Sequence, residues 1–508
     1  MTVKNYSIEN IKAFRNEANI QIKPITVFVG KNSSGKSSLL RFPVVLSQSI
    51  SSDAETPIVL FGKNIDYGNY EDVVFDHNKK GSMHFSVSYE CDPSRFYENY
   101  SKEAIYGKAI GKTVDVCFDV SVIKYSRRMI VDACEIQING RKCLEVERNS
   151  REIYKVHIID YLDENKRIEL PSEKVAFSKF IPWFGTEELA DSIIRVINQN
   201  KGLETGQIEL IKRKIRKNSY ECTVEEKESF GKNYEDVTNV FEWFKLIDMY
   251  SRIVMSARIQ AAQEAESTYY IGPFRENPNR VYRDVEHRVD AVGTRGEDVS
   301  TMLRNDYFHG KKVINGVSEW LNKSMQYGVS LKEIGGGLYS IVVKKRDGKK
   351  DNLIDVGYGI SQVLPIVAQL MSIRDDGAAR RYYPYSAMNI STFIIEQPEL
   401  HLHPEAQAEL ANLFVNSVVS NSESKRLNVM IETHSEHLIR RLQALVASDK
   451  YIITNEDVAI YYVDKNENNE AYIQEMKLLP NGQFEKDWPS GFFDKGYQLA
   501  LELVRGVE

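Results

Sequence analysis

The pattern of hydrophobic and polar residues predicts a buried strand and a helix near the start of the chain. Residues 25–30, ITVFVG, form an almost continuous apolar run, which is typical of a strand covered on both faces. The stretch KSSLLRFPVVLSQSI then predicts a helix in which Pro43 can introduce a bend. We therefore expect a strand, a short turn and a helix in this region.

Short alternating stretches follow from about residue 57 to residue 161. HFSVSYE, TVDVCFDVSVI, IVDACEIQING and YKVHIIDYL each predict a strand, and Asn139-Gly140 predicts a tight turn. Together they predict an antiparallel meander that extends the N-terminal sheet. Residues 172–266 predict mainly helices, and strand patterns return over residues 327–345.

The C-terminal part alternates between helix and strand patterns. Residues 361–372, 406–419 and 436–447 predict helices, whereas residues 391–395 and 427–432 predict strands. This alternation favours an α/β core.

Composition narrows the class of protein. The 508 residues carry a net charge of −6, so no overall positive field points to nucleic acid. The N-terminal residues lack the apolar core of a signal peptide, and the longest apolar run, near residues 363–371, is too short to span a bilayer. Five cysteines without close spacing favour reduced thiols, and hence a cytoplasmic location.

The octapeptide GKNSSGKS, Gly30 to Ser37, matches the pattern G-x-x-x-x-G-K-[ST] and lies between the predicted strand and helix. Its glycines let the backbone approach phosphate oxygens, and the helix N-terminus adds partial positive charge. Lys36 is expected to reach the β- and γ-phosphates, and the Ser37 hydroxyl is expected to ligate magnesium. The sequence therefore predicts a site for ATP and Mg²⁺.

A second apolar strand runs into polar residues in FIIEQPELHLHP, residues 393–404. Glu396 follows the apolar run directly, and we expect its carboxylate to face the metal. Gln397 occupies the position at which ATPases built in this way usually carry the acid that activates water. His401 and His403 lie two residues apart, but no cysteine or carboxylate completes a zinc set at a familiar spacing.

Two further segments place polar residues at the ends of predicted elements. VMIETHSEH, residues 429–437, is an apolar strand whose His434 is placed to contact a γ-phosphate or its water, although a lone histidine is often structural. IDVGYGISQVLPI, residues 354–366, is a glycine-spaced turn that opens a helix. Gly359 and Ser361 would leave that helix N-terminus open to a phosphate, although an ordinary helix cap has the same pattern.

Together these motifs resemble the ABC-type ATPases of the SMC, RecF and OLD lineage. NIKAFRNEANIQIKPITVFVGKNSSGKSSLL looks like the opening of that lineage, GYGISQVLPI like its modified signature motif, and ETHSEH like its switch-histidine loop. YIGPFRENPNRVY, VGTRGED and DWPSGFFD are similar to a bacterial branch with a small C-terminal domain of unknown function. That branch is similar to the ATPase subunits of anti-phage systems such as Septu and PARIS. The resemblance does not extend over the stretch from about residue 80 to residue 260.

The resemblance implies an α/β fold, a two-lobed P-loop ATPase head of the ABC or SMC type that dimerises around two ATP molecules. Together with the strand and helix patterns above, it divides the chain into an N-terminal ATPase lobe (1–78), an antiparallel β extension (79–170), a helical insertion (171–265), a family-specific segment with a β-hairpin (266–345), a C-terminal ATPase lobe (346–465) and a small C-terminal domain (466–508).

The same resemblance assigns roles to individual residues. The residues that it implies for nucleotide binding are Gly30, Asn32, Ser33, Ser34, Gly35, Lys36, Ser37 and Ser38, joined by Gly359 and Ser361 of the partner chain. It implies that Ser37 and Glu396 hold magnesium, and that Glu396, Gln397 and His434 act in catalysis.

Gln397 departs from the family pattern. A carboxylate there would accept a proton from the attacking water, whereas a neutral amide can only orient it. General-base catalysis contributes about 100- to 10,000-fold, so its loss predicts slow hydrolysis and a long-lived ATP-bound dimer. Glu399, two residues on, is an alternative base. We expect ATP to act mainly as an assembly clamp, with hydrolysis as a slow reset.

The predicted function is that of the ATPase subunit of an anti-phage defence complex, which responds to a phage-derived trigger and controls a toxic nuclease effector acting in trans. No nuclease is recognised in the chain itself, because Asp457 and Asp464 are better explained as exposed turn residues. A RecF-like DNA-repair ATPase that clamps DNA is the alternative, and a scaffold that binds ATP without useful turnover is a third. The basic residues 212–217, KRKIRK, are a local hint of DNA or RNA binding, although a solvated helix face also explains them.

Overall fold

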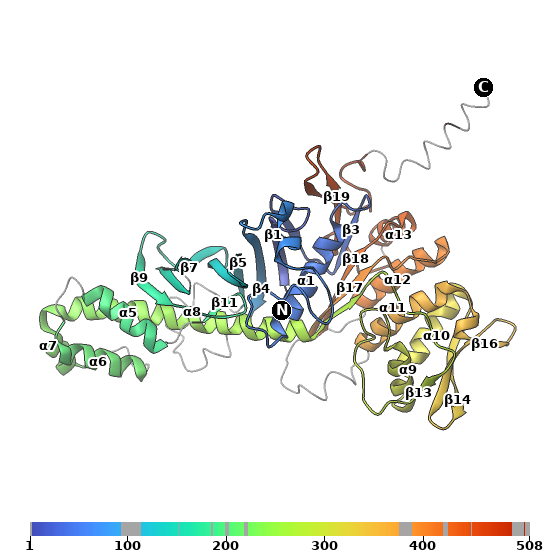
Figure 1. Ribbon diagram of the computed structural model, residues 1–508, viewed down its shortest axis with the longest axis horizontal. Coiled ribbons are helices and arrows are strands. Elements are labelled where there is room, and N and C mark those ends of the chain that lie inside the picture. Colours follow the sequence, from blue (N-terminus) through green and yellow to red (C-terminus); the bar gives the residue numbers. More distant parts are fainter. Residues whose placement is uncertain are drawn as a thin grey trace. The chain divides into compact units, whose positions relative to one another are not determined.

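The computed structural model describes residues 3–92, 113–150, 152–183, 186–198, 203–217, 222–374, 389–419, 425–448, 450–489 and 502. The fold is mixed α/β (Figure 1). The chain divides into two compact units. Unit 1 comprises residues 1–20 and 45–265, and unit 2 comprises residues 21–44 and 266–508. The boundaries of the six segments expected from the sequence stay predictions. Among the described residues, no helix is long and apolar enough to cross a membrane.

An eight-stranded sheet dominates unit 1, in the order β2-β1-β4-β5-β6-β7-β8-β9. The pairings from β1 through β4 to β9 are all antiparallel, as the predicted meander requires. Asn139 and Gly140 both have positive φ, so they form the tight turn after β6. The strands are β1 (Val3–Glu9), β2 (Ala18–Gln21), β4 (Met83–Cys91), β5 (Val114–Tyr125), β6 (Arg128–Ile138), β7 (Arg141–Ser150), β8 (Ile153–Ile159) and β9 (Arg167–Lys174).

The helices of unit 1 follow this sheet in the sequence. They are α5 (Thr186–Asn198), α6 (Thr205–Arg216), α7 (Val224–Phe230) and the 33-residue α8 (Tyr234–Glu266), with the 3-10 turn η2 (Gly231–Asn233) before α8. Helices α5, α6 and α7 gather near the first turns of α8 (Figure 1). The prediction of mainly helix over residues 172–266 misses a small sheet formed by β10 (Ala176–Ser178) and β11 (Ile181–Trp183).

The basic residues 212–217 lie on α6 and are partly neutralised by acidic neighbours. Lys214 is buried and pairs with Glu226 at 2.7 Å, and Lys212 pairs with Asp191 at 2.9 Å. These ion pairs reduce the positive charge that α6 can offer to a polyanion.

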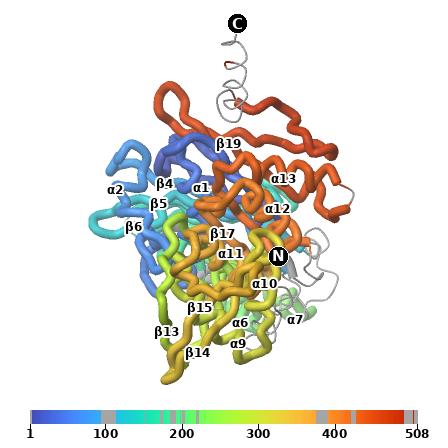
Figure 2. Tube along the Cα trace, turned by 90° about the vertical axis from the view of Figure 1, so that its right-hand side faces the viewer, coloured from blue at the N-terminus to red at the C-terminus, as the bar shows by residue number. Residues whose placement is uncertain are grey.

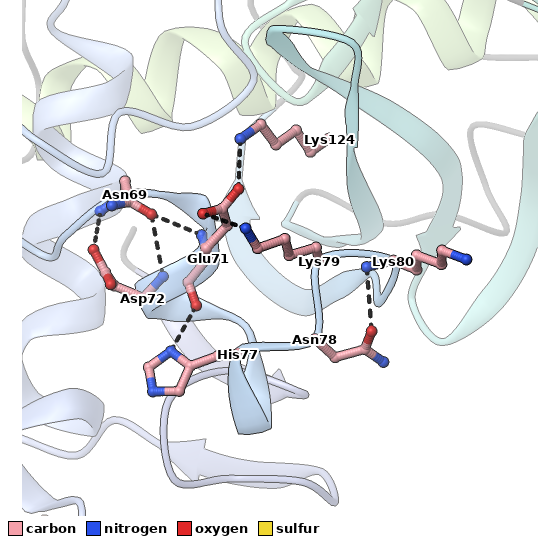
Figure 3. Close-up of polar contacts among 8 residues, drawn as sticks. All are labelled: Asn69, Glu71, Asp72, His77, Asn78, Lys79, Lys80 and Lys124. Carbon is pink, nitrogen blue, oxygen red and sulfur yellow. Dashed lines mark hydrogen bonds and ion pairs between the residues drawn. The ribbon is translucent and has the colours of Figure 1, made fainter.

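A polar network fixes the short helix α2 (Tyr70–Val73) in unit 1 (Figure 3). The Asn69 side chain accepts hydrogen bonds from the backbone N–H groups of Glu71 and Asp72, and so caps the helix. Glu71 pairs with Lys124 of β5 at 2.9 Å and with Lys79 at 3.5 Å. The next turn is the 3-10 helix η1 (Phe75–His77), in which the His77 ring contacts the Glu71 carbonyl. The network therefore joins α2 to the edge of β5.

Glu264 is a buried carboxylate on α8 that accepts a hydrogen bond from the Val3 backbone N–H at 2.9 Å. Burial raises the pKa of Glu264 from 4.5 to about 7, although the bond from Val3 opposes the rise. The folded state thus binds this proton more tightly than the unfolded state. The contribution of Glu264 to stability is therefore fully present below about pH 4.5 and is lost as the pH rises through about 7.

As the pH rises, the wild type should lose about 3 kcal/mol of its free energy of unfolding through Glu264. We expect Glu264→Gln to keep this free energy, because the amide stays neutral and its oxygen can still accept the hydrogen bond from Val3. Urea unfolding from about pH 5 to about pH 8 should give a flatter stability profile for Glu264→Gln than for the wild type. Glu242→Gln, at an exposed position of α8, is the matched control and should keep the wild-type slope. Equal slopes in all three proteins would contradict the expectation.

A six-stranded sheet forms the core of unit 2, in the order β12-β17-β18-β3-β19-β20. The first five strands are parallel, and β20 closes the sheet as an antiparallel edge. The strands are β12 (Thr268–Ile271), β17 (Asn389–Glu396), β18 (Lys425–Glu432), β3 (Ile25–Gly30), β19 (Val458–Lys465) and β20 (Ala471–Glu475). The α/β core expected from the sequence is thus confirmed, and all six residues of β3 are buried.

Helices pack on this sheet as the alternating pattern requires. Helix α1 (Lys36–Ile50) follows β3, and α11 (Tyr358–Arg374), α12 (Pro404–Val419) and α13 (Glu436–Val446) come from the C-terminal part. Helices α12 and α13 lie side by side, and α12 contacts β18 (Figure 1). The 3-10 turns η3 (Leu353–Asp355) and η5 (Asn455–Asp457) precede α11 and β19.

The remaining part of unit 2 is a small sheet with two helices, α9 (Val299–Phe308) and α10 (Lys312–Met325). The strand pattern over residues 327–345 forms the hairpin of β14 (Gly328–Gly335) and β15 (Leu338–Lys344). Strands β13 (Tyr282–Arg283) and β16 (Lys350–Asn352) both pair with β15, and α10 packs against β14 (Figure 2).

Candidate functional site

The loop between β3 and α1 has the backbone that a phosphate-binding loop needs. Gly30 has a φ of 143°, and a Cβ at this residue would lie 2.0 Å from the Val463 carbonyl oxygen, so only glycine fits. Gly35 has a φ of 112° and Ser33 a φ of 59°. Helix α1 begins at Lys36, directly after these turns. Asn32 and Ser33 are exposed, and the Ser38 N–H is bonded to the Gly35 carbonyl.

Lys36 and Ser34 are the buried polar side chains of this loop. The Lys36 ammonium donates to the carbonyl oxygens of Gly30 at 3.1 Å and Lys31 at 2.6 Å. Burial lowers the pKa of Lys36, although Glu432 and Asp464 oppose this effect. Within the described part of the chain, the buried Ser34 hydroxyl has no hydrogen-bond partner. A phosphate oxygen at the loop would satisfy this hydroxyl, so the loop fits a nucleotide.

Two glutamates end neighbouring parallel strands and stand beside this loop. Glu396 of β17 lies in register with Glu432 of β18, and both residues are buried. Arg41 of α1 donates to both Glu396 oxygens, at 2.5 Å from Nε and 2.7 Å from Nη2, and the Tyr270 hydroxyl lies 2.6 Å from Oε1. Ser37 instead donates to Glu432 Oε2 at 2.6 Å. The two carboxylates therefore have different partners.

Acidic and basic neighbours have opposite effects on the pKa of Glu432. Burial raises the pKa of Glu432, and the charge of Glu396 adds to the rise, whereas the Ser37 bond and the charges of Lys36 and Arg41 lower it. No role was predicted for Glu432 from the sequence, although VMIE ends in a glutamate just as FIIE does.

Gln397 is held by its backbone at the end of β17. It has a φ of 44°, in the left-handed region, and its N–H donates to the Glu432 carbonyl at 2.8 Å. The buried Arg275 donates to the carbonyls of Glu396 at 2.6 Å and Gln397 at 3.2 Å. Arg275 therefore fixes the end of this strand. By contrast, the exposed Arg280 pairs with Asp355, at 2.6 Å, in the loop that precedes α11.

Glu399 and His434 meet next to the two glutamates. The His434 backbone N–H donates to Glu399 Oε1 at 2.7 Å. Glu399 Oε2 is buried and has no hydrogen-bond partner among the described residues, and burial raises the pKa of this carboxyl. Burial also lowers the pKa of His434, and the positive charge of Lys36 adds to this effect. A lowered pKa favours the neutral imidazole, the form that can accept a proton.

The signature segment makes contacts of its own. A Cβ at Gly359 would lie 2.7 Å from the His401 carbonyl oxygen, so this glycine allows α11 to approach the loop after β17. The Ser361 hydroxyl donates to the Tyr358 carbonyl at 2.8 Å within α11. Neither contact involves the phosphate-binding loop, and the expected role of Gly359 and Ser361 across a dimer stays a prediction.

Asp464 belongs to this site, and its interpretation as an exposed turn residue is wrong. It lies in β19, its side chain is 14% exposed, and it pairs with Lys31 of the phosphate-binding loop at 2.8 Å. The Tyr462 hydroxyl also donates to it at 2.9 Å. Asp464 therefore anchors the first residue after Gly30. Asp457 instead caps the turn at Thr454.

Comparisons with protein families extend over most of the chain. Residues 1–439 match a family described as AAA ATPase domain. Residues 453–503 match a family described as a protein of unknown function, DUF3696. Part of the predicted DWPSGFFD motif, from residue 490 onward, lies outside the described residues. No curated protein sequence matches the chain.

Solved structures of SMC head domains are similar to the chain at low sequence identity. The SmcHead bound to the C-winged helix domain of ScpA is 11% identical, with 94% of this chain and 98% of that chain covered and a TM-score of 0.37. The Smc head domain of Pyrococcus furiosus, bound to the C-terminal domain of ScpA, is 12% identical, with 99% of each chain covered and a TM-score of 0.37. The SMC head domain from Thermotoga maritima is 10% identical, with 94% of this chain and 100% of that chain covered and a TM-score of 0.35.

Proposed function

The chain belongs to the AAA ATPase domain family, and we propose that it binds ATP with magnesium and hydrolyses it slowly in order to control a partner protein. The family supports the ATPase activity. The slow rate of hydrolysis, the assembly of the protein and the process that it serves are proposed in addition.

The phosphate-binding loop is the observation that carries the proposal. Its strained glycine at Gly30, the Lys36 ammonium and the unsatisfied Ser34 hydroxyl all lie at the N-terminal end of α1. Such an end attracts phosphate oxygens through its free N–H groups and partial positive charge. Lys36 can exchange its loop carbonyls for phosphate oxygens, because both of its partners are neutral.

Oxygen donors beside the loop suit magnesium. The Ser37 hydroxyl and the carboxylates of Glu396 and Glu432 provide the hard ligands that this ion prefers. Magnesium, when bound, would neutralise part of the charge on the phosphates. Lys36 would hold the nucleotide, and a carboxylate at the end of β17 or β18 would hold the metal together with Ser37. Glu396 is the ligand expected from the sequence.

Slow hydrolysis follows from the residues next to the phosphate-binding loop. Gln397 can orient water but cannot take its proton, and its φ of 44° fixes the start of the loop that it opens. Glu399 is the alternative base, since it is a buried carboxylate with one free oxygen among the described residues. A site whose base is Glu399, two residues from the usual position, would hydrolyse ATP slowly and keep its nucleotide for long periods.

Long-lived nucleotide favours a role in assembly. In the proposed mechanism two copies close around two ATP molecules, with Lys36 of one copy and the segment of Gly359 and Ser361 of the other on each nucleotide. The resemblance to ATPase subunits of anti-phage systems supports a defence function, in which this assembly senses a phage-derived trigger and controls a nuclease effector in trans. The DNA-clamp alternative loses support because Lys212 and Lys214 are already paired with acidic residues.

Lys36→Ala tests nucleotide binding. Loss of a charged hydrogen-bond donor should weaken the affinity for ATP with magnesium by about 10- to 100-fold, measured by calorimetry with a non-hydrolysable analogue. Lys477→Ala, at an exposed position of unit 2, is the matched control and should bind like the wild type. Protection of bacteria against phage should be lost with Lys36→Ala and kept with Lys477→Ala.

Three outcomes would contradict the proposal. A wild-type protein without affinity for ATP and magnesium would remove its basis, and so would a Lys36→Ala variant that binds normally. Turnover that DNA stimulates, with a steep dependence on salt, would support the DNA-clamp alternative instead.

A further inference from the structure

The two buried glutamates at the ends of β17 and β18 differ in what already holds them. We infer that Glu432, rather than Glu396, is the protein carboxylate that binds magnesium together with Ser37. This inference rests on the proposed function, because it assigns a ligand within the same nucleotide site. It departs from the expectation that the carboxylate after the FII run faces the metal.

Glu396 is committed to an ion pair within unit 2. Both of its oxygens accept from Arg41, and Oε1 also accepts from Tyr270. Its side chain is only 3% exposed. A metal ion at Glu396 would have to displace the guanidinium or share one carboxylate with it. Arg275, bonded to the Glu396 carbonyl, further fixes this residue in place.

Glu432 has the opposite arrangement. Its Oε2 is 2.6 Å from the hydroxyl of Ser37, so the two oxygen groups already converge at the start of α1. Its strand β18 pairs directly with β3, which leads into the phosphate-binding loop. Among the described residues, no guanidinium donates a hydrogen bond to Glu432, because Arg41 donates to Glu396 instead. Glu432 is therefore the carboxylate that can accept a cation without first losing one.

The surroundings are consistent with a magnesium ion that is held mainly by the nucleotide. Across the described ranges, no group of three or more histidine, cysteine, aspartate or glutamate side chains is arranged to hold a metal on its own. Magnesium in nucleotide sites usually has one or two protein oxygens, with phosphates and water completing its shell. Ser37 and Glu432 supply two such oxygens.

The test measures how strongly magnesium tightens the binding of a non-hydrolysable ATP analogue, by calorimetry in excess magnesium and in EDTA. In the wild type, magnesium should tighten binding clearly. In Glu432→Gln the gain due to magnesium should shrink by about 10- to 100-fold, the scale of losses when metal-site partners are removed. In EDTA this variant should bind at least as tightly as the wild type, because a negative charge next to the phosphates has gone.

Glu396→Gln is the comparison variant, since it removes the neighbouring carboxylate while its amide oxygen can still accept from Arg41. It should retain the magnesium-dependent gain. Thermal unfolding of this variant is measured as well, because Arg41 loses its charged partner. Glu432→Asp keeps a carboxylate and should retain part of the gain, so the inference stays testable even if Glu432→Gln unfolds, which thermal unfolding would reveal.

The outcomes separate this inference from the function on which it rests. Absence of binding in the wild type would defeat the proposed function. Normal binding in the wild type, with the magnesium gain kept in Glu432→Gln and lost in Glu396→Gln, would overturn only the inference. Loss of the gain in both variants, or in neither, would overturn it as well.

Discussion

Glu399→Gln is expected to slow ATP hydrolysis by about 100- to 10,000-fold while the variant still binds ATP, because the amide cannot take a proton from water. The amide oxygen can keep the bond from the His434 N–H, so the loop should hold its shape. Steady-state phosphate release and the affinity for the ATP analogue would be measured on the same protein. A fall in the rate without a fall in affinity would identify Glu399 as the base.

The pH dependence of turnover is a second test of Glu399 as the base. Burial raises the pKa of Glu399, and the bond from the His434 N–H opposes this rise without cancelling it. The carboxylate must be ionised to act as a base. Turnover should therefore fall on acidification at a higher pH than an ordinary glutamate would give, and Glu399→Gln should lack this limb.

Two variants provide the controls for this experiment. Glu405→Gln changes an exposed glutamate of α12 and should leave the rate unchanged. Gln397→Glu restores the acid that the family usually carries and should raise the rate above that of the wild type. Suppose that the wild type hydrolyses ATP fast and that the rate is the same in Glu399→Gln and in Gln397→Glu. Neither position would then limit the reaction.

Arg41→Ala is expected to destabilise the protein by about 3–5 kcal/mol, because it leaves a buried carboxylate without its cation. The Glu396 side chain is 3% exposed, so its charge is poorly solvated without the guanidinium. The bond from Tyr270 remains, but a hydroxyl does not carry a compensating charge. Urea unfolding followed by a probe in unit 2 would measure the loss.

A double-mutant cycle gives the sharper result. Arg41→Ala combined with Glu396→Gln should recover most of the stability, because the neutral amide no longer needs a cation. Arg440→Ala breaks an exposed pair with Glu436 on α13 and should cost at most about 1 kcal/mol. An Arg41→Ala variant as stable as Arg440→Ala would show that Glu396 does not depend on its ion pair.

Local patterns were sufficient for a large part of the fold. The sequence was enough to predict the strand ITVFVG, the loop up to Ser37 and the helix after it. The apolar run, the turn residues and the start of the helix all lie within one short stretch of the chain. The charged strand β7 was missed, since RKCLEVERNS lacks clear alternation. The small sheet of β10 and β11 was missed because its strands have only three residues each.

The site was predicted less completely than the fold. Lys36 and Ser37 lie inside one motif, and sequence could identify them. Arg41, Glu432 and Asp464 acquire their partners only through the order and register of the parallel strands, which no single segment encodes. The sequence offered a signal for Glu432, because VMIE and FIIE both end in a glutamate after an apolar run.

The order of strands in unit 2 also bears on how the protein is made. Ile25 of β3 pairs with Val429 on one side and Val458 on the other. A ribosome that adds about 5–20 residues per second needs roughly 20 to 80 s to synthesise the roughly 400 residues between them. Throughout this interval ITVFVG is an apolar, uncharged segment without its neighbours, and such segments are prone to aggregate. Slow growth at low temperature, or extra chaperone, should therefore raise the yield of soluble protein more than any change of buffer after lysis.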